Sequence, residues 1–316
     1  MILNLLANNL KKFFSINLKE FIAYIIVFSF IPFFIRKFIA RNKVTILLYH
    51  DPKKDIMQKH LEYLNKKYNF ISLKDLINAI NDKNWSQIPE YPLLFTYDDG
   101  HKGNYKLIKL FEKYDIKPTI YVCTKIVNSL KSFWFKILDD KNKEILKKFS
   151  QEKREKVLKE KFKFDKDKEY SLDKRYSLNA KELKNMSKYV NFESHSRYHP
   201  ILPKCNNIVS FKEIKMSKID LKNIFNETFK NFSFPNGDYS EREIAYLKKI
   251  GYKSARTCDI GWNDFYTNPY YLKTCLISDE ASITMLKAQV SGVTGYLRYL
   301  VKFGSLNGRK KIVYKI

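Results

Sequence analysis

Residues 93–100 read Leu93-Leu94-Phe95-Thr96-Tyr97-Asp98-Asp99-Gly100, an apolar run that ends in two adjacent carboxylates. The pattern predicts a short buried strand over 93–97, bounded by Pro92 and Gly100. In parallel α/β folds, catalytic groups and ligands collect at the carboxyl ends of the strands, so Asp98 and Asp99 lie where a site is expected. A plain turn is the alternative interpretation of Asp-Asp-Gly.

A second polar stretch follows another short apolar run and reads Val190-Asn191-Phe192-Glu193-Ser194-His195-Ser196-Arg197-Tyr198-His199-Pro200. It contains two of the five histidines of the chain. Two imidazoles at this spacing, with a carboxylate from another strand end, would provide three metal ligands and leave one position open, as in catalytic divalent-metal sites. The alternative is a pair of surface histidines in a loop before a proline.

Three motifs, in this order, resemble those of the polysaccharide deacetylases of carbohydrate esterase family 4. The first is Thr96-Tyr97-Asp98-Asp99-Gly100, the second is His195-Ser196-Arg197-Tyr198-His199-Pro200, and the third is Phe234-Pro235-Asn236-Gly237. The resemblance covers roughly residues 44–292. It implies an α/β fold, a distorted parallel (β/α) barrel, and a metal-dependent hydrolase that acts on an N-acetylated glycan.

The resemblance also implies roles for single residues. Asp99, His195 and His199 would bind a divalent metal, with Zn²⁺ expected, and Asp98 would be the general base for a water that attacks the acetamide. The residues expected to contact the substrate are Tyr97, Pro235, Gly237 and Trp262. Removal of O-acetyl groups, or a catalytically inactive barrel that only binds glycans, are the alternative functions.

The chain departs from the family pattern at two places. Many members carry an arginine two residues before the proline of the third motif, where this chain has Ser233, so the guanidinium must come from elsewhere or is not used. The late histidine that serves as general acid is also missing, since Leu272-Lys273-Thr274-Cys275 contains none. His50 or His101 is the candidate acid, unless a metal-activated water and Asp98 handle both proton transfers. Asp259 and Trp262 resemble the fourth motif only faintly.

Strand and helix patterns alternate along the chain, as a parallel α/β barrel requires. Strands are predicted over 44–50, 119–123, 232–235 and 255–258, and helices over 57–67, 73–81, 103–114, 211–229 and 241–250. Between about 128 and 189 the alternation stops, and a charge-dense helical insertion is expected. It opens with Phe133-Trp134-Phe135, which we interpret as a hydrophobic anchor for the insertion, with a sugar-stacking lid as the alternative.

Residues 1–42 are predicted to be a membrane-associating helical segment, ahead of a catalytic domain over 43–316. Residues 3–14 could form an amphipathic helix, and residues 21–35 follow without a charge. Fifteen uncharged residues fall short of the roughly 20 that span a bilayer, so interfacial insertion is at least as well supported as crossing. The alternative is a helix that packs on the domain as part of its core. A cleaved signal peptide fits poorly, because basic residues come directly after the apolar run and no cleavage site of small residues follows it.

The formal net charge is +26, but the lysines are spread throughout the chain. We therefore expect no nucleic-acid partner and favour attraction to an anionic membrane surface, with a bacterial inner membrane as the expected location and the side undetermined. The four cysteines have no Cys-x-x-Cys spacing and are interpreted as free thiols, with a Cys258–Cys275 disulfide as the alternative. Isolated thiols favour a reducing compartment and would suit action on lipid-linked glycans at the cytoplasmic face.

Overall fold

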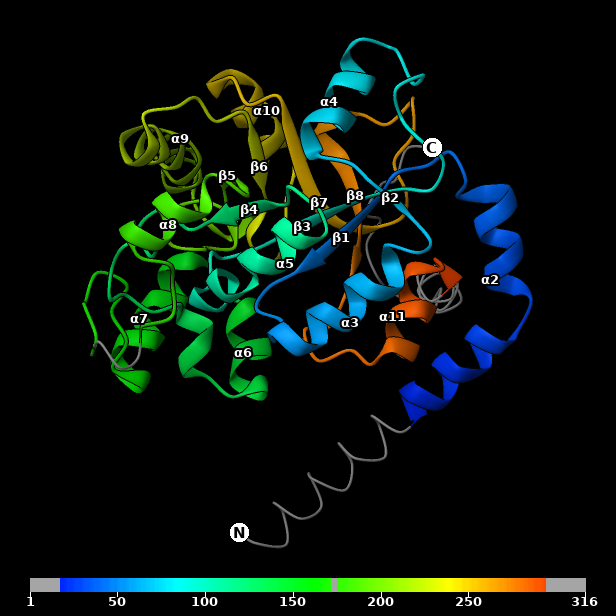
Figure 1. Cartoon of the computed structure of the whole chain (residues 1–316). Helices are drawn as coiled ribbons and strands as arrows, with labels where there is room; N and C mark the ends of the chain where they lie inside the picture. The colour runs from blue at the N-terminus through cyan, green and yellow to red at the C-terminus, as the bar shows by residue number, and fades with distance from the viewer. Residues whose placement is uncertain (1–17, 172–174, 294–316) are drawn as a thin grey trace, which may run out of the picture.

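The computed structural model describes residues 18–171 and 175–293, and a parallel β-barrel lies at its centre (Figure 1). The strands pair in the order β1-β8-β7-β6-β5-β4-β3-β2, and β1 also pairs with β3. Seven strands therefore close the barrel, and β2 extends it outside β3. The bounds are β1 Thr45–Tyr49, β2 Asn69–Phe70, β3 Pro92–Tyr97, β4 Thr119–Val122, β5 Asn191–Ser194, β6 Asn231–Ser233, β7 Ser254–Ile260 and β8 Leu272–Leu276. The expected distorted parallel (β/α) barrel is confirmed.

The strands of the barrel are apolar on both faces because side chains fill the interior and helices cover the outside. Every residue of β1, β3 and β4 is buried. Of the three strands absent from the predicted set, β5 coincides with the short apolar run before His195, whereas nothing in the sequence pattern indicated β2 or β8. The strand β2 has only two residues, and β8 mixes buried and exposed positions with a lysine at its second residue, so neither shows a clear pattern. Pairing with β1 and β7 is what identifies β8 as the strand that completes the barrel.

Helices follow most strands and pack outside the barrel (Figure 1). Two predicted helices have the predicted bounds, α4 and α10, and each begins with a capping box, at Ser72 and Ser240. The long helix α9 begins four residues earlier than predicted, because Asn206 caps it. The bounds are α3 Lys54–Leu64, α4 Leu73–Asn81, α5 Ile108–Lys113, α6 Asp140–Lys147, α7 Gln151–Phe162, α8 Ala180–Met186, α9 Asn207–Phe225, α10 Glu241–Ile250 and α11 Ile283–Val290, with short 3₁₀ helices η2 Lys102–Leu107, η3 Trp134–Ile137, η5 Leu202–Lys204, η6 Pro235–Gly237 and η7 Pro269–Tyr271.

The segment between β4 and β5 holds η3, α6, α7 and α8 and has a hydrophobic core of its own. Trp134 belongs to this core together with Leu138, Leu146, Leu158 and Phe164. Its indole Nε1 also donates a hydrogen bond of 3.0 Å to the carbonyl of His199. Trp134 therefore ties the inserted helices to the loop after β5, which supports the anchor interpretation of the aromatic cluster.

The N-terminal part of the described chain is a bent pair of helical segments beside α11. A helix over Leu18–Phe28 is followed, at an angle of 61°, by α2 (Ile31–Phe34) and the π-helical turn η1 (Ile35–Ile39). Within residues 18–171 and 175–293, no single helix has both the length and the apolar character for a membrane span; the bent pair meets that test jointly, on length and composition alone. The predicted amphipathic helix over 3–14 lies outside the described residues.

All four cysteines are free thiols, as expected from their spacing. Cys123 and Cys205 are buried, whereas Cys258 and Cys275 are partly exposed. The Cys258–Cys275 disulfide that the sequence left open is not formed, so no covalent cross-link contributes to the stability of the barrel.

Candidate metal centre and active site

Asp99, His195 and His199 form a buried cluster at the carboxyl ends of β3 and β5. Each offers one ligand atom, and these atoms lie within 4.8 Å of one another. The Oδ1 atom of Asp99 is 3.4 Å from Nε2 of His199 and 3.6 Å from Nε2 of His195. The structure thus brings together the three residues for which the sequence predicted metal binding.

The loops that carry the cluster adopt an unusual backbone. Asp99, Ser196 and His199 have φ angles of 72°, 64° and 59°, in the left-handed region. Residues other than glycine adopt this backbone region at a cost of about 1 kcal/mol or more each, and residues in such conformations concentrate at functional sites. The adjacent Gly100 has a φ of 72° as well, and a Cβ there would lie 2.8 Å from Cγ1 of Val122. The turn after β3 therefore needs glycine at this position.

Gly100→Ala should lower the free energy of unfolding by more than the roughly 1 kcal/mol that left-handed alanine alone costs, because the added methyl also displaces Val122 and Val127. Urea denaturation measures this loss. Gly251→Ala is the matched control, since Gly251 has a φ of 85° but a Cβ there would meet nothing closer than 3.7 Å. Equal losses in the two variants would show that Val122 and Val127 do not restrict the turn.

Groups behind the cluster orient its ligands. His195 donates from Nδ1 to the carbonyl of Ser233 at 2.9 Å, which leaves the Nε2 lone pair facing Asp99. His101 donates from Nε2 to Oδ2 of Asp99 at 3.1 Å. The other oxygen of that carboxylate, Oδ1, is buried without a hydrogen-bond partner among the described residues. One carboxylate oxygen and the Nε2 atoms of two imidazoles therefore face the same point.

The electrostatics favour the protonation states that metal ligands need. Burial raises the pKa of Asp99, but His199, His101 and His195 outweigh it and hold that pKa well below its usual range. Burial lowers the pKa of His199 to about 4, although Asp99 acts in the opposite direction. An ionised Asp99 and a neutral His199 form the ligand chemistry of a divalent cation, and two imidazoles with one carboxylate suit Zn²⁺. The residues present therefore fit such a metal.

Asp98 lies beside the cluster and is paired with an arginine that sequence reasoning missed. The guanidinium of Arg256, on β7, donates from Nη2 both to Oδ2 of Asp98 and to Oγ of Ser233. Ser233 and Arg256 face each other across the β6–β7 pairing. The arginine that the family pattern places at 233 is thus replaced by one from the next strand. An arginine inside the predicted strand 255–258 was the sequence signal that could have revealed it, and the structure buries this side chain fully.

The two candidate acids occupy different positions. His101 is buried, donates to Asp99 and lies with its ring 5.3 Å from that of Phe133. His50 is partly exposed and follows β1, directly beside the strand that carries Asp98, since the amide of Asp98 donates to the carbonyl of Tyr49 at 3.0 Å. His50 therefore borders the site, whereas His101 lies behind a ligand.

Among the predicted substrate contacts, Pro235 and Gly237 lie in η6, two and four residues after Ser233. The structure does not bring Tyr97 to the site. Its ring is completely buried, stacks on Tyr49 and has its hydroxyl against Met57, because alternation along β3 turns it away from Asp98.

Trp262 is also placed elsewhere. Its ring lies against Gly292, where a Cβ would be 2.2 Å from the indole. The next residue, Asn263, pairs with Val44 ahead of β1, at the end of the barrel opposite to the metal ligands. We therefore leave Trp262 and Tyr97 out of the site. Phe135, by contrast, packs on the cluster, with its ring 4.9 Å from that of His199.

A sequence profile of the family described as polysaccharide deacetylase matches residues 87–255, which is more than half of the chain. The chain belongs to the polysaccharide deacetylase family. It is accordingly a hydrolase that cleaves amide or ester bonds in the deacetylation of a polysaccharide. The matched region includes all three metal-ligand candidates, Asp98 and Ser233, and it ends one residue before Arg256.

Several solved structures share the fold of this chain. The Streptococcus pyogenes deacetylase PplD, in complex with acetate, matches with a TM-score of 0.57 at 19% identity over 78% of this chain and 98% of its own. IcaB from Ammonifex degensii matches with a TM-score of 0.58 at 14% identity over 80% and 97%. A de-N-acetylase from Aggregatibacter actinomycetemcomitans matches with a TM-score of 0.53 at 15% identity over 78% and 98%. No curated protein matches the chain significantly.

Proposed function

We propose that this polysaccharide deacetylase depends on a divalent metal, Zn²⁺, and removes N-acetyl groups from a sugar of a surface polysaccharide or its precursor. The proposal rests on the different surroundings of two adjacent carboxylates, Asp98 and Asp99. Asp99 faces two imidazole nitrogens with an unpartnered oxygen, while Asp98, whose Oδ2 lies 3.8 Å from Nε2 of His195, is paired with Arg256. The de-N-acetylase among the structural relatives supports an amide substrate over an ester.

A cation bound by Asp99, His195 and His199 would supply Lewis acidity at the acetyl carbonyl and would acidify a water molecule. Asp98 is the base in this proposal. Arg256 donates a hydrogen bond to the Oδ2 atom of Asp98 and holds the carboxylate in place, and the carboxylate accepts the proton from the attacking water. The C–N bond then breaks, acetate leaves, and the departing amine takes up a proton. Pro235 and Gly237, next to Ser233, are proposed to contact the sugar.

We propose His50 as the group that protonates the amine, because it is partly exposed at the end of β1. His50→Gln should lower kcat about 100-fold without changing the metal content. His101→Gln should instead weaken metal affinity about 10- to 100-fold, since it removes the hydrogen bond to Asp99. Steady-state kinetics and metal titration of both variants separate the roles. Full activity of the His50 variant would assign the second proton transfer to Asp98.

Acetate release tests the function directly. The full-length chain is stripped of metal, reloaded with Zn²⁺ and assayed on chitooligosaccharides and on O-acetylated xylan, with Asp98→Asn as the inactive control. Metal-restored release from the amide substrate is the expected result. Release from xylan alone would establish the O-acetyl esterase instead, and stoichiometric metal binding without release from either substrate would favour a barrel that only binds glycans.

A further inference from the structure

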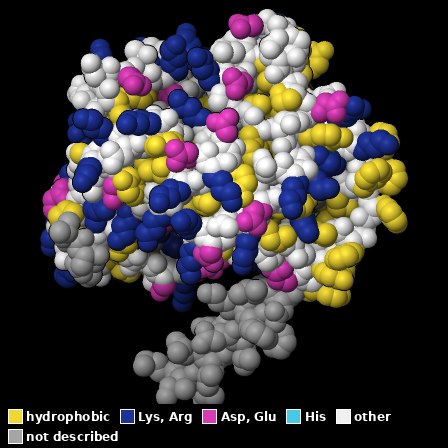
Figure 2. Space-filling view, in the orientation of Figure 1, with side chains coloured by type: hydrophobic (Ala, Val, Ile, Leu, Met, Phe, Trp, Pro, Cys, Tyr) yellow, Lys and Arg dark blue, Asp and Glu magenta, His cyan; other side chains and the backbone are white. Residues whose placement is uncertain are grey.

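Large hydrophobic side chains are exposed along one bent segment, residues 18–39. Phe30, Phe28 and Phe38 are 81%, 70% and 67% exposed. The other exposed large hydrophobic side chains of the segment are Leu18, Phe21, Ile22, Tyr24, Ile25, Ile31, Phe33, Phe34 and Ile39. Figure 2 shows them as a hydrophobic band at the edge of the molecule where Figure 1 places α2. A contiguous apolar surface of this kind marks an interaction site.

The opposite side of the segment packs against the barrel domain, so the segment cannot rotate to bury its exposed side without losing these contacts. Ala23 and Ile26 are buried against Ala288 and Val293 at α11. Further along, the Arg36 guanidinium lies 3.9 Å from the centre of the Tyr91 ring and also contacts Tyr68 and the carbonyl of Lys67.

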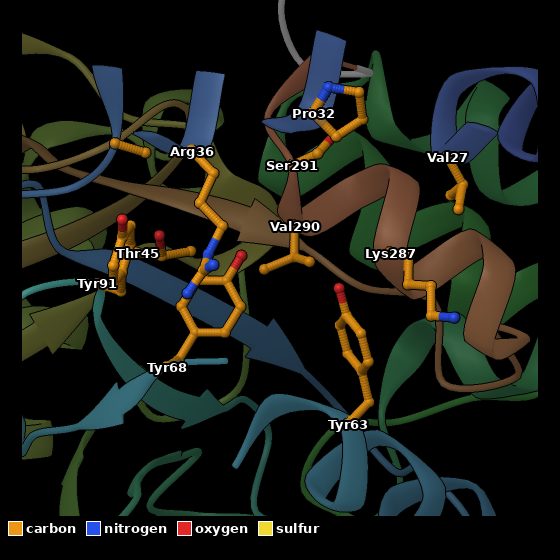
Figure 3. A pocket seen from close by; sticks show the side chains of 11 residues that line it. Val27, Pro32, Arg36, Thr45, Tyr63, Tyr68, Tyr91, Lys287, Val290 and Ser291 are labelled. Carbon is orange, nitrogen blue, oxygen red and sulfur yellow. The ribbon is translucent and has the colours of Figure 1, made fainter. Parts of the chain in front are cut away.

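Figure 3 shows how the segment meets the barrel. Arg36 reaches down beside the Tyr68 and Tyr91 rings, in a pocket between the segment and the barrel. Because the contacts come from both halves of the bent pair, the bend is part of the packed fold. The apolar surface is therefore presented as one fixed face.

Basic residues accompany this apolar face. Lys19 and Lys37 are exposed, and the Lys37 ammonium lies 5.6 Å and 5.5 Å from the ring centres of Phe33 and Phe38. Arg41 and Lys43 follow in the sequence and form ion pairs with Glu90 and Asp264, so Lys19 and Lys37 are the cations assigned to this face. The single acid of residues 18–43, Glu20, accepts a hydrogen bond from Ser282 of the barrel domain. Aromatic and aliphatic side chains with lysine and arginine at their margins suit the interface of an anionic bilayer.

We propose that residues 18–39 dock this protein on an anionic lipid bilayer as a monotopic anchor, lying in the membrane interface without crossing it. A straight helix of this length would reach about 33 Å, enough for a hydrocarbon core of about 30 Å. To become one straight helix, however, the segment would have to lose the bend ahead of Pro32. It would also have to lose the contacts of Ala23 and Ile26 with α11 and the contact of Arg36 with Tyr91. The fold therefore favours the interfacial position.

Docking of this kind leaves the metal centre accessible. Arg36 contacts Tyr91 and Lys67, which precede β3 and β2, whereas Asp98 and His195 follow the other ends of β3 and β5. The α2 and η1 part of the anchor thus lies at the end of the barrel opposite to the site. A membrane-docked chain would act on a glycan that extends away from the lipid surface.

Flotation of the full-length chain with vesicles tests the docking. Binding is expected to vesicles of phosphatidylcholine with phosphatidylglycerol and to be weaker with phosphatidylcholine alone. The triple variant Phe30→Ser, Phe33→Ser, Phe38→Ser should bind at least about tenfold more weakly. The matched control is Ile208→Ser with Tyr266→Ser, which removes side chains that are 79% and 86% exposed elsewhere, and it should bind like the wild type. Equal binding of wild type and triple variant would overturn the proposal.

A labelling experiment distinguishes docking from crossing. Leu18→Cys and Ile39→Cys, each labelled with a membrane-impermeant maleimide outside sealed vesicles, should react equally above the wild-type background. Protection of one position but not the other would show a crossing segment and overturn the monotopic anchor.

A dimer in lipid-free solution that the triple variant converts to a monomer, with no vesicle binding, would assign the surface to a second copy of the chain. Acetate release from a soluble oligosaccharide should be the same in all variants, so this test is independent of the deacetylase assignment.

Discussion

Asp98→Asn should bind a divalent cation as tightly as the wild type and lose acetate release by about 10²- to 10⁴-fold, the contribution of a general base. The amide has the shape of the carboxylate and can still accept a hydrogen bond from Arg256, but it cannot take a proton from water. His199→Ala should lose both the metal and the activity, because it removes one of the three ligand atoms that lie within 4.8 Å of one another. Metal analysis after gel filtration and acetate release measure the two properties on the same samples.

Three outcomes would contradict this assignment of roles. Equal metal content in the two variants would mean that His199 is not a ligand. Full activity in Asp98→Asn would mean that another group takes the proton. Loss of metal in Asp98→Asn would mean that Asp98 and Asp99 both bind the cation, and the separate base would then have to be sought elsewhere.

Arg256→Met should have the second largest effect, on stability and on turnover together. The guanidinium is fully buried and is the cation that pairs with Asp98. Removal of one member of a buried ion pair leaves an uncompensated charge and costs about 3–5 kcal/mol. We expect the free energy of unfolding to fall by that amount and kcat to fall at least about tenfold, because Asp98 loses its orientation. Urea denaturation and steady-state kinetics measure the two effects.

A control and a rescue make the Arg256 experiment specific. Arg242→Met removes another arginine that pairs with a buried carboxylate, that of Glu243, and should lower stability without the loss of kcat. The double variant Ser233→Arg, Arg256→Ser moves the guanidinium to the position that the family pattern prescribes and should recover part of kcat. Unchanged kcat in Arg256→Met would show that Asp98 needs no arginine.

The ligand set could be predicted from the sequence because its residues are close together in short motifs. His195 and His199 share one loop, and Asp99 follows a strand that is apolar throughout. Alternation along that strand could also have excluded Tyr97, since Thr96 and Asp98 share one face and Tyr97 points to the other.

Other parts of the site depend on pairings that no local pattern encodes. Arg256 reaches Asp98 only because β6 and β7 lie side by side and set Ser233 opposite Arg256. Trp262 lies away from the site because the chain turns back after β7. Asn263 then pairs with Val44, a contact between residues far apart in the sequence. In the same way, β8 is defined by its neighbours in the barrel more than by its own five residues.

Reconstitution of the metal-free enzyme tests the central claim most directly. Zn²⁺ is added in steps to the stripped full-length chain, and the rate of acetate release from chitooligosaccharide is measured at each step. The account predicts that the rate rises linearly and reaches its plateau at one equivalent of metal. A full rate in the metal-free protein, or a rate that does not respond to added metal although one equivalent is bound, would contradict it.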